Sequence, residues 1–174
     1  MTSEADRAFE EALRRAKDRA AQLLAETWNC GYSPFMALAE ALGLEASEEM
    51  IGASIAFAGG ISGNRHICGA LWAAVAAVGA YARKRMASEG RVPRGGGPEF
   101  IQANSEIHDL ASRVYKEFVS MFGSPNCGDL NPRFDLVSPE QQRLCRALVR
   151  KGVEIALRVL RDKYGPEVVG GGTR

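Results

Sequence analysis

Hydrophobic residues recur at steps of three and four along most of the chain, which is the spacing of one face of an α-helix. From about Glu4 to Trp28 charged side chains fill the positions outside one face, which is made of Phe9, Leu13, Ala16, Ala20, Leu23, Leu24 and Thr27. No stretch alternates between apolar and polar residues over a length that would indicate a β-strand. The pattern predicts an all-α protein.

Two shorter helices are predicted after the first. Ser33 is the expected N-cap of one, because a proline follows it at the first helical position, and Gly43 is its expected C-cap. Ser47 precedes two glutamates, which favours the start of another helix that ends at Gly59 and Gly60.

Three longer helices complete the predicted set. An alanine-rich segment from about Cys68 to Ala87 is the candidate for the central helix, since small side chains allow close helix packing. Apolar residues at helical spacing from Ile107 to Phe122 predict the fifth helix. A Ser-Pro-Glu start at Ser138 predicts the last. We therefore expect a compact bundle of five to six helices.

The chain of 174 residues is expected to form a single helical domain spanning residues 1–174. Two prolines and three glycines between residues 91 and 98 predict a flexible surface loop within that domain. The glycine-rich end, residues 166–174, predicts a frayed tail.

Charge and hydropathy exclude several classes of function. The 22 Lys and Arg residues balance 21 Asp and Glu residues, so bulk charge indicates no nucleic-acid binding. No apolar run reaches the roughly 20 residues that span a bilayer, so we expect no membrane insertion. The first residues lack the basic start and apolar core of a secretory signal, which predicts a cytoplasmic protein whose thiols are kept reduced.

Four cysteines, Cys30, Cys68, Cys127 and Cys145, are the residues whose chemistry needs an explanation. They contain no Cys-x-x-Cys pair, which excludes a thioredoxin-type motif, a zinc ribbon and a c-type haem site. Three lie near predicted helix starts, where we expect the helix dipole to lower the thiol pKa. The alternative is that these thiols are small hydrophobic side chains of the core.

The residues around the cysteines resemble the C-GCAxxG-C-C redox-active protein family. The resemblance covers about Arg19 to Leu160. It rests on Asn29-Cys30 before a short helix, Gly59-Gly60-Ile61-Ser62-Gly63 before Cys68-Gly69-Ala70, Phe122-Gly123-Ser124-Pro125-Asn126-Cys127, and Cys145 in a helix.

The resemblance implies a small helical redox protein in which the four cysteines are metal ligands or redox thiols. The expected supporting loops contain Gly59, Gly60, Gly63, Gly69 and Gly128. The family is similar to the non-haem part of split-Soret cytochromes, which are helical dimers with an iron–sulfur cluster on four cysteines. It therefore also implies a homodimer.

The leading hypothesis is an iron–sulfur cluster that is bound by the four thiolates and passes electrons to a redox partner protein. One alternative is a cofactor-free protein in which two cysteine pairs cycle between dithiol and disulfide. Another is a structural or regulatory zinc site, for which His66 is a candidate extra ligand. We place no catalytic triad or carboxylate pair, so we expect an electron-transfer or accessory protein rather than an autonomous enzyme.

Overall fold

A computed structural model describes residues 3–92, 95–133, 135 and 138–170 of the chain. These residues form α-helices, one short 3₁₀ helix and no β-strand, which confirms the all-α prediction. The elements are α1 (Glu4–Thr27), α2 (Tyr32–Leu42), α3 (Glu48–Ala56), α4 (Gly69–Ser88), α5 (Gly97–Ala103), α6 (Ser105–Phe122), α7 (Cys127–Leu130), α8 (Pro139–Tyr164) and η1 (Pro166–Val168).

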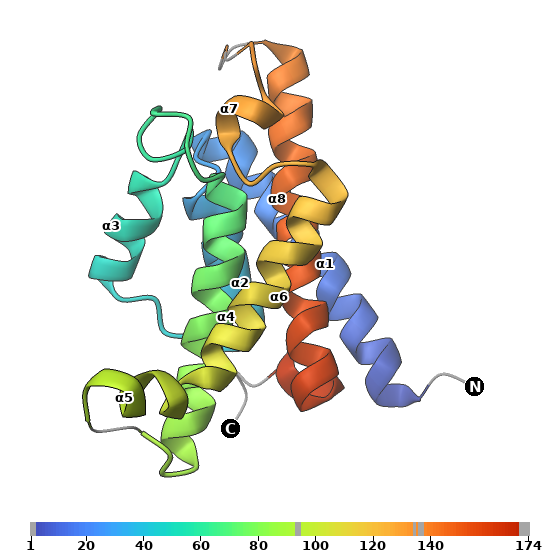
Figure 1. The fold of residues 1–174 in the computed structure, drawn as a ribbon. Coiled ribbons are helices and arrows are strands. Elements are labelled where there is room, and N and C mark those ends of the chain that lie inside the picture. Colours follow the sequence, from blue (N-terminus) through green and yellow to red (C-terminus); the bar gives the residue numbers. More distant parts are fainter. Residues whose placement is uncertain (1–2, 93–94, 134, 136–137, 171–174) are drawn as a thin grey trace.

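The alanine-rich helix α4 packs against α2, α6 and α8, as expected for a central helix (Figure 1). Its inward face is made of fully buried small side chains, among them Ala70, Ala73, Ala74 and Ala77. A β-carbon added at Gly152 of α8 would lie 3.0 Å from the carbonyl oxygen of Ala70. The small residues therefore let α4 and α8 approach backbone to backbone.

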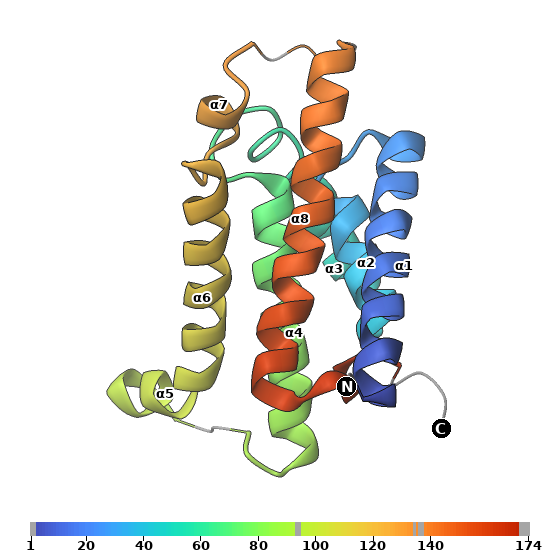
Figure 2. The ribbon, with the colours of Figure 1, turned by 90° about the vertical axis from the view of Figure 1, so that its right-hand side faces the viewer.

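Helix α1 packs along α2 and α8, and Figure 2 shows α1, α8 and α6 running roughly side by side. The predicted inward face of α1 is buried except for Thr27, which is exposed in the last turn. An ion-pair network joins the outer side of α1 to α8. Glu154 of α8 lies 2.7 Å from Lys17 Nζ and 2.9 Å from Lys151 Nζ.

The start of α2 differs from the prediction. Its N-cap is Gly31, while Ser33 lies within the first turn and donates its hydroxyl to the Asn29 carbonyl at 2.7 Å. The side-chain oxygen of Asn29 accepts hydrogen bonds from the N–H groups of Gly31 and Tyr32, at 3.1 and 2.8 Å. Because Asn29 satisfies those early donors, the helix begins before the proline.

Two further segments depart from the sequence analysis. The predicted loop at residues 91–98 already enters α5 at Gly97, and residues 93–94 lie outside the described part of the chain. The tail predicted to be frayed from residue 166 begins with η1, whose Val168 is only 2% exposed against the core. An apolar contact at Val168 thus orders the start of the tail, while residues 171–174 lie outside the described residues.

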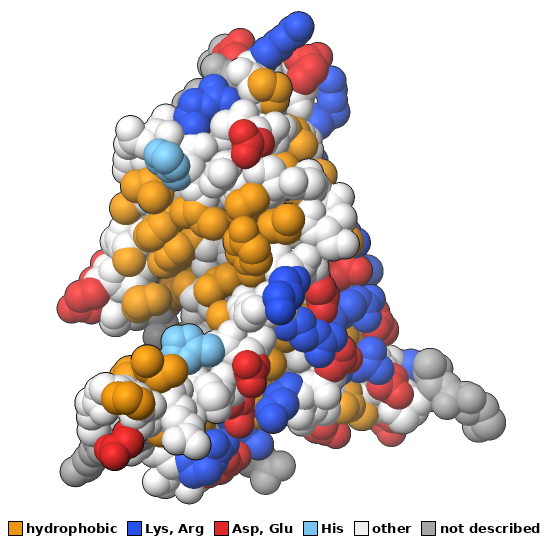
Figure 3. All heavy atoms as spheres, viewed as in Figure 1, with side chains coloured by type: hydrophobic (Ala, Val, Ile, Leu, Met, Phe, Trp, Pro, Cys, Tyr) orange, Lys and Arg blue, Asp and Glu red, His pale blue; other side chains and the backbone are white. Residues whose placement is uncertain are grey.

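One face of the molecule is broadly apolar. Figure 3 shows hydrophobic side chains gathered over α3, α4 and α6, with charged side chains around them. Where α3 ends against α4, Phe57 stacks on Trp72 with ring centroids 4.3 Å apart. None of the helices that the structure describes is both long and apolar enough to cross a membrane.

Candidate redox centre

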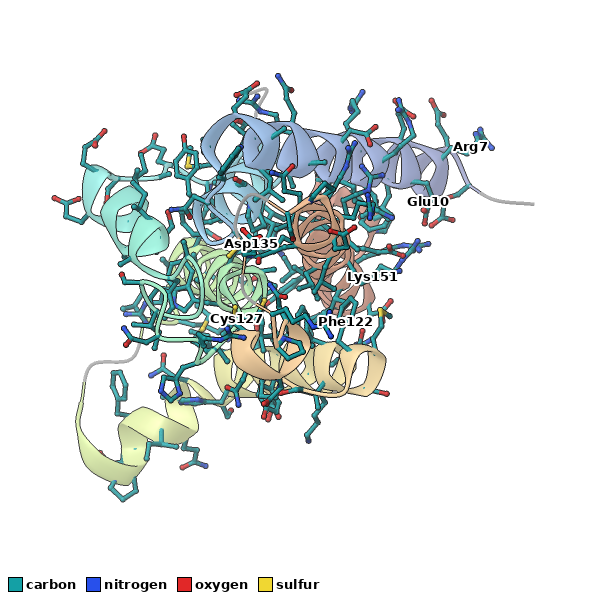
Figure 4. The ribbon with its side chains drawn as sticks, turned by 90° about the horizontal axis from the view of Figure 1, so that it is seen from above. Arg7, Glu10, Phe122, Cys127, Asp135 and Lys151 are labelled. Carbon is teal, nitrogen blue, oxygen red and sulfur yellow. The ribbon has the colours of Figure 1, made fainter. Side chains whose placement is uncertain are left out.

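The four cysteines come from four separate parts of the chain and lie at one end of the bundle. Cys30 follows α1, Cys68 is the N-cap of α4, Cys127 begins α7, and Cys145 lies in the second turn of α8. This is the upper end in Figure 1, and Figure 4 looks down on it with Cys127 labelled.

A cavity of about 680 Å³ lies among these elements. Cys30, Cys127 and Cys145 line it, together with residues from α1, from the loop before α4 and from the start of α8. Cys68 is 4% exposed and interacts electrostatically with Cys30 and Cys127. The structure thus brings the four sequence-predicted cysteines to one region, with three at the cavity wall and the buried Cys68 near Cys30 and Cys127.

Cys30 is held by backbone N–H groups from two other segments. Burial raises the pKa of the Cys30 thiol, and backbone hydrogen bonds from Gly59 and Gly69 only partly offset that effect. A β-carbon on Gly69 would lie 2.9 Å from Cys30 Sγ and 2.9 Å from the Gly31 nitrogen. Only glycine therefore allows this close approach of the α4 start to Cys30.

Cys68 lies at the N-terminus of α4, where the N–H groups of Leu71 and Ala70 stabilise its charged form. Burial nevertheless raises the pKa of the Cys68 thiol to about 12, and Cys30 adds to the rise. Burial likewise raises the pKa of Cys145 to about 12 and raises that of Cys127. The predicted lowering of the thiol pKa values at helix starts is therefore wrong, because desolvation outweighs the helix dipole.

The segments before Cys68 and Cys127 are paired with each other. Ile67 and Asn126 form an isolated antiparallel bridge. The Cys68 N–H donates to the Pro125 carbonyl at 2.8 Å, and the Cys127 N–H donates to the His66 carbonyl at 2.7 Å. Backbone pairing thus fixes these two cysteines relative to each other, although 58 residues separate them in the chain.

Arg65 reinforces this pairing and was not singled out by the sequence. Its guanidinium donates to the carbonyl oxygens of Gly128 and Asn131, and its charge lowers the pKa of Cys127 against the larger effect of burial. A β-carbon on Gly128 would lie 3.1 Å from the Arg65 carbonyl oxygen. Gly128 therefore allows a close contact between the start of α7 and Arg65.

The loop before α4 has an unusual backbone. Five consecutive residues have positive φ angles, namely Gly59 (65°), Gly60 (71°), Ile61 (63°), Ser62 (49°) and Gly63 (82°). A β-carbon on Gly60 would also lie 2.6 Å from the His66 carbonyl oxygen. This left-handed run brings the Gly59 N–H to Cys30 and places Gly59, Ser62 and Gly63 at the cavity wall. Ile61 and Ser62 are strained there, which is a feature of functional sites.

His66 takes part in the candidate site through its backbone, not through its imidazole. Its N–H donates to the Gly60 carbonyl at 3.1 Å and its carbonyl accepts from Cys127, while its side chain is exposed and does not line the cavity. Among the residues that the structure describes, no three His, Cys, Asp or Glu side chains are grouped closely enough to hold a metal ion as they stand. The described thiols are free.

Comparisons with known proteins show the family of the chain. A family model described as "Putative redox-active protein (C_GCAxxG_C_C)" matches residues 28–159, which include the four cysteines. An "Uncharacterized protein" of Archaeoglobus fulgidus is 45% identical over 153 residues, covering 88% of this chain and 98% of that protein. No solved structure matches the chain. The chain is therefore a helical protein of a redox-active class, and it belongs to the C_GCAxxG_C_C family.

Proposed function

We propose that this protein binds an iron–sulfur cluster at its four cysteines and transfers electrons through it. The observation that carries the proposal is the cavity lined by Cys30, Cys127 and Cys145, with the buried Cys68 close enough to Cys30 to interact with it electrostatically. Cysteine thiolates are the usual ligands of such clusters, and a bound cluster would supply one-electron chemistry.

The arrangement of the sulfurs favours a cluster over a single zinc ion. A zinc ion needs its thiolates about 2.3 Å from one point, whereas a cluster offers separate iron atoms to separate ligands. Thiols spaced around a cavity suit the second requirement better. The N–H groups that reach Cys30 and Cys68 would hydrogen-bond to the ligating sulfurs and tune the reduction potential.

The cluster proposal carries with it a proposed location and a proposed partner. We propose a cytoplasmic location, which keeps the thiols reduced before loading. The proposal also includes a redox partner protein and no autonomous enzymatic activity. The homodimer implied by the family resemblance stays a prediction, which light scattering tests by measuring whether the molar mass is twice the 18.8 kDa of one chain.

The first experiment is anaerobic purification followed by a visible spectrum and by iron, sulfide, zinc and free-thiol counts on one sample. We expect visible absorbance with stoichiometric iron and sulfide, and loss of both in each Cys→Ser variant. Ala80→Ser is the matched control, because it adds a serine to α4 three turns away from Cys68.

Each other result contradicts the cluster proposal in a defined way. A colourless, metal-free protein whose thiol count rises on reduction would indicate dithiol–disulfide chemistry. Stoichiometric zinc without sulfide would indicate a zinc site. Four thiols that bind nothing and do not change on reduction would make the cysteines core residues.

A further inference from the structure

The cysteine-lined cavity extends well beyond the three thiols at its wall. It extends along the end of α1 to Trp28 and along the start of α8 to Arg146. Its volume of about 680 Å³ falls within the range of roughly 300–1,000 Å³ in which proteins bind small organic molecules. The lining is mainly apolar and includes Leu24, Trp28 and several alanines beside the thiols.

Trp28 lies at this cavity with an unfavourable backbone conformation. It caps α1 with a left-handed backbone, at a φ of 54°, which bulky side chains rarely adopt. The side chain is also 52% exposed, so the strain is not balanced by burial in the core. An indole face that stays open at a cavity wall is suited to stack on a planar ligand.

Arg146 supplies a positive charge at the same cavity. The other arginines and lysines of α8 all have a carboxylate partner, for example Arg143 with Glu140 at 3.2 Å and Arg150 with Asp18 at 2.7 Å. Arg146 has no hydrogen bond or ion pair with any residue that the structure describes. The described lining also contains no Asp or Glu, so the charge of the cavity wall is positive.

We propose that this cavity binds a small organic anion, whose planar apolar body lies against Trp28 and whose anionic group pairs with Arg146. The ligand would lie beside Cys145 and therefore next to the candidate redox centre. This inference goes beyond the proposed function, and binding of the anion does not require a bound cluster.

Two probes of the same shape separate the charge from the apolar contact. The carboxylate 4-nitrobenzoate and its neutral isostere 4-nitrobenzamide are titrated into the full chain by calorimetry. Both are titrated into the wild type, Arg146→Gln, Trp28→Ala and Arg15→Gln. Arg15 is the charge-matched control, because it is exposed on α1 and does not line this cavity.

We expect 4-nitrobenzoate to bind the wild type more tightly than the amide. Arg146→Gln should weaken the anion about fivefold or more and leave the amide unchanged, because only the anion loses a charge-assisted contact. Trp28→Ala should weaken both probes, and Arg15→Gln should change neither. Equal affinity for the two probes, absence of binding, or equal effects of Arg146→Gln and Arg15→Gln would overturn the proposal.

Iron and sulfide counts on the same samples keep this inference separate from the cluster proposal. If the wild type prefers the anion but holds no iron or sulfide under any preparation, the cluster proposal fails and the anion site stands. If it holds a cluster but shows no preference for the anion, the anion site fails and the cluster proposal stands. Circular dichroism of each variant shows that the helical fold is retained.

Discussion

Single glycines decide how closely the segments of the site approach one another. Gly69 and Gly79 both lie in α4, but their surroundings differ. A β-carbon at 69 would meet Cys30 Sγ at 2.9 Å, whereas one at 79 would meet only the Ile107 side chain at 3.6 Å. The two positions therefore form a matched pair for testing close approach.

Gly69→Ala should destabilise the protein by about 1–3 kcal/mol, because either Cys30 or the α4 start has to shift. Gly79→Ala should be neutral or should stabilise the protein by about 0.5–1 kcal/mol, since alanine restricts the unfolded chain and favours the helix. Urea unfolding midpoints of the two variants and the wild type measure both effects. Equal midpoints for the variants would contradict the packing that the structure shows around Cys30.

The thiols should also react in a fixed order. All four have raised pKa values, so alkylation of the reduced, metal-free protein by iodoacetamide should be slow near neutral pH and should accelerate as the pH rises. Cys127 is only half-buried and lies near Arg65, so it should react first, and the buried Cys68 should react last. Mass spectrometry of timed samples gives the order. Arg65→Gln should slow the reaction of Cys127. Early modification of Cys68 would contradict this order and would show that the cysteine-bearing end of the bundle opens in solution.

At the scale of elements, the contact between α1 and α8 depends on a half-buried carboxylate. Burial opposes ionisation of Glu154, but hydrogen bonds from Lys17 and Lys151 outweigh it and lower the pKa of Glu154 to about 2 from its ordinary value of 4.5. A carboxyl with a lowered pKa stabilises the fold fully above its unfolded pKa. That contribution is lost as the pH falls from about 4.5 towards about 2.

Glu154→Gln should destabilise the protein at pH 7 by roughly 1–2 kcal/mol, after allowance for solvent screening. The difference from the wild type should shrink as the pH is lowered through this window, because protonated Glu154 has also lost its charge. Denaturant unfolding at pH 7, 4 and 3 measures it. Glu140→Gln makes the same change at an exposed position of α8 and should have little effect. If the wild type and Glu154→Gln differed in unfolding free energy by the same amount at every pH, the charge of Glu154 would not be the cause.

The helices could be predicted from the sequence where local signals agree. Periodicity and caps place α1, α4, α6 and α8 within a few residues of their bounds. The start of α2 could not be placed, because the side chain of Asn29 competes with the Ser-Pro signal. The short helix α7 was also missed, since four residues carry too little periodicity to be recognised.

The candidate site was predicted only in part. The cysteines and glycines are visible in the sequence because of their residue types, and the structure gathers them. The role of Arg65 depends on a loop more than 60 residues away along the chain, and no local pattern indicates it. The direction of the thiol pKa shifts depends on burial, which sequence position near a helix start does not reveal.

At the scale of the whole molecule, a group bound at the cysteines would connect four distant segments of the chain. Such a group binds the folded state and stabilises it by mass action. Protein reconstituted with iron and sulfide should unfold at a higher temperature than metal-free protein, by at least about 4–8 °C for a gain of about 2 kcal/mol. Differential scanning calorimetry of both forms measures the shift. The Cys68→Ser variant should show no shift, and an unchanged wild-type midpoint would contradict binding across these segments.

The backbone from Gly59 to Gly63 turns with the opposite hand to the α-helices around it. L-residues in that conformation cost about 1–2 kcal/mol each, and glycine would remove the cost at Ile61 and Ser62. A chain selected for stability alone would therefore have glycine at all five positions rather than at three. Ser62 nevertheless lines the thiol-lined cavity, and its neighbour Ile61 is 43% exposed. Engineering this loop for heat resistance would accordingly alter the wall of that cavity.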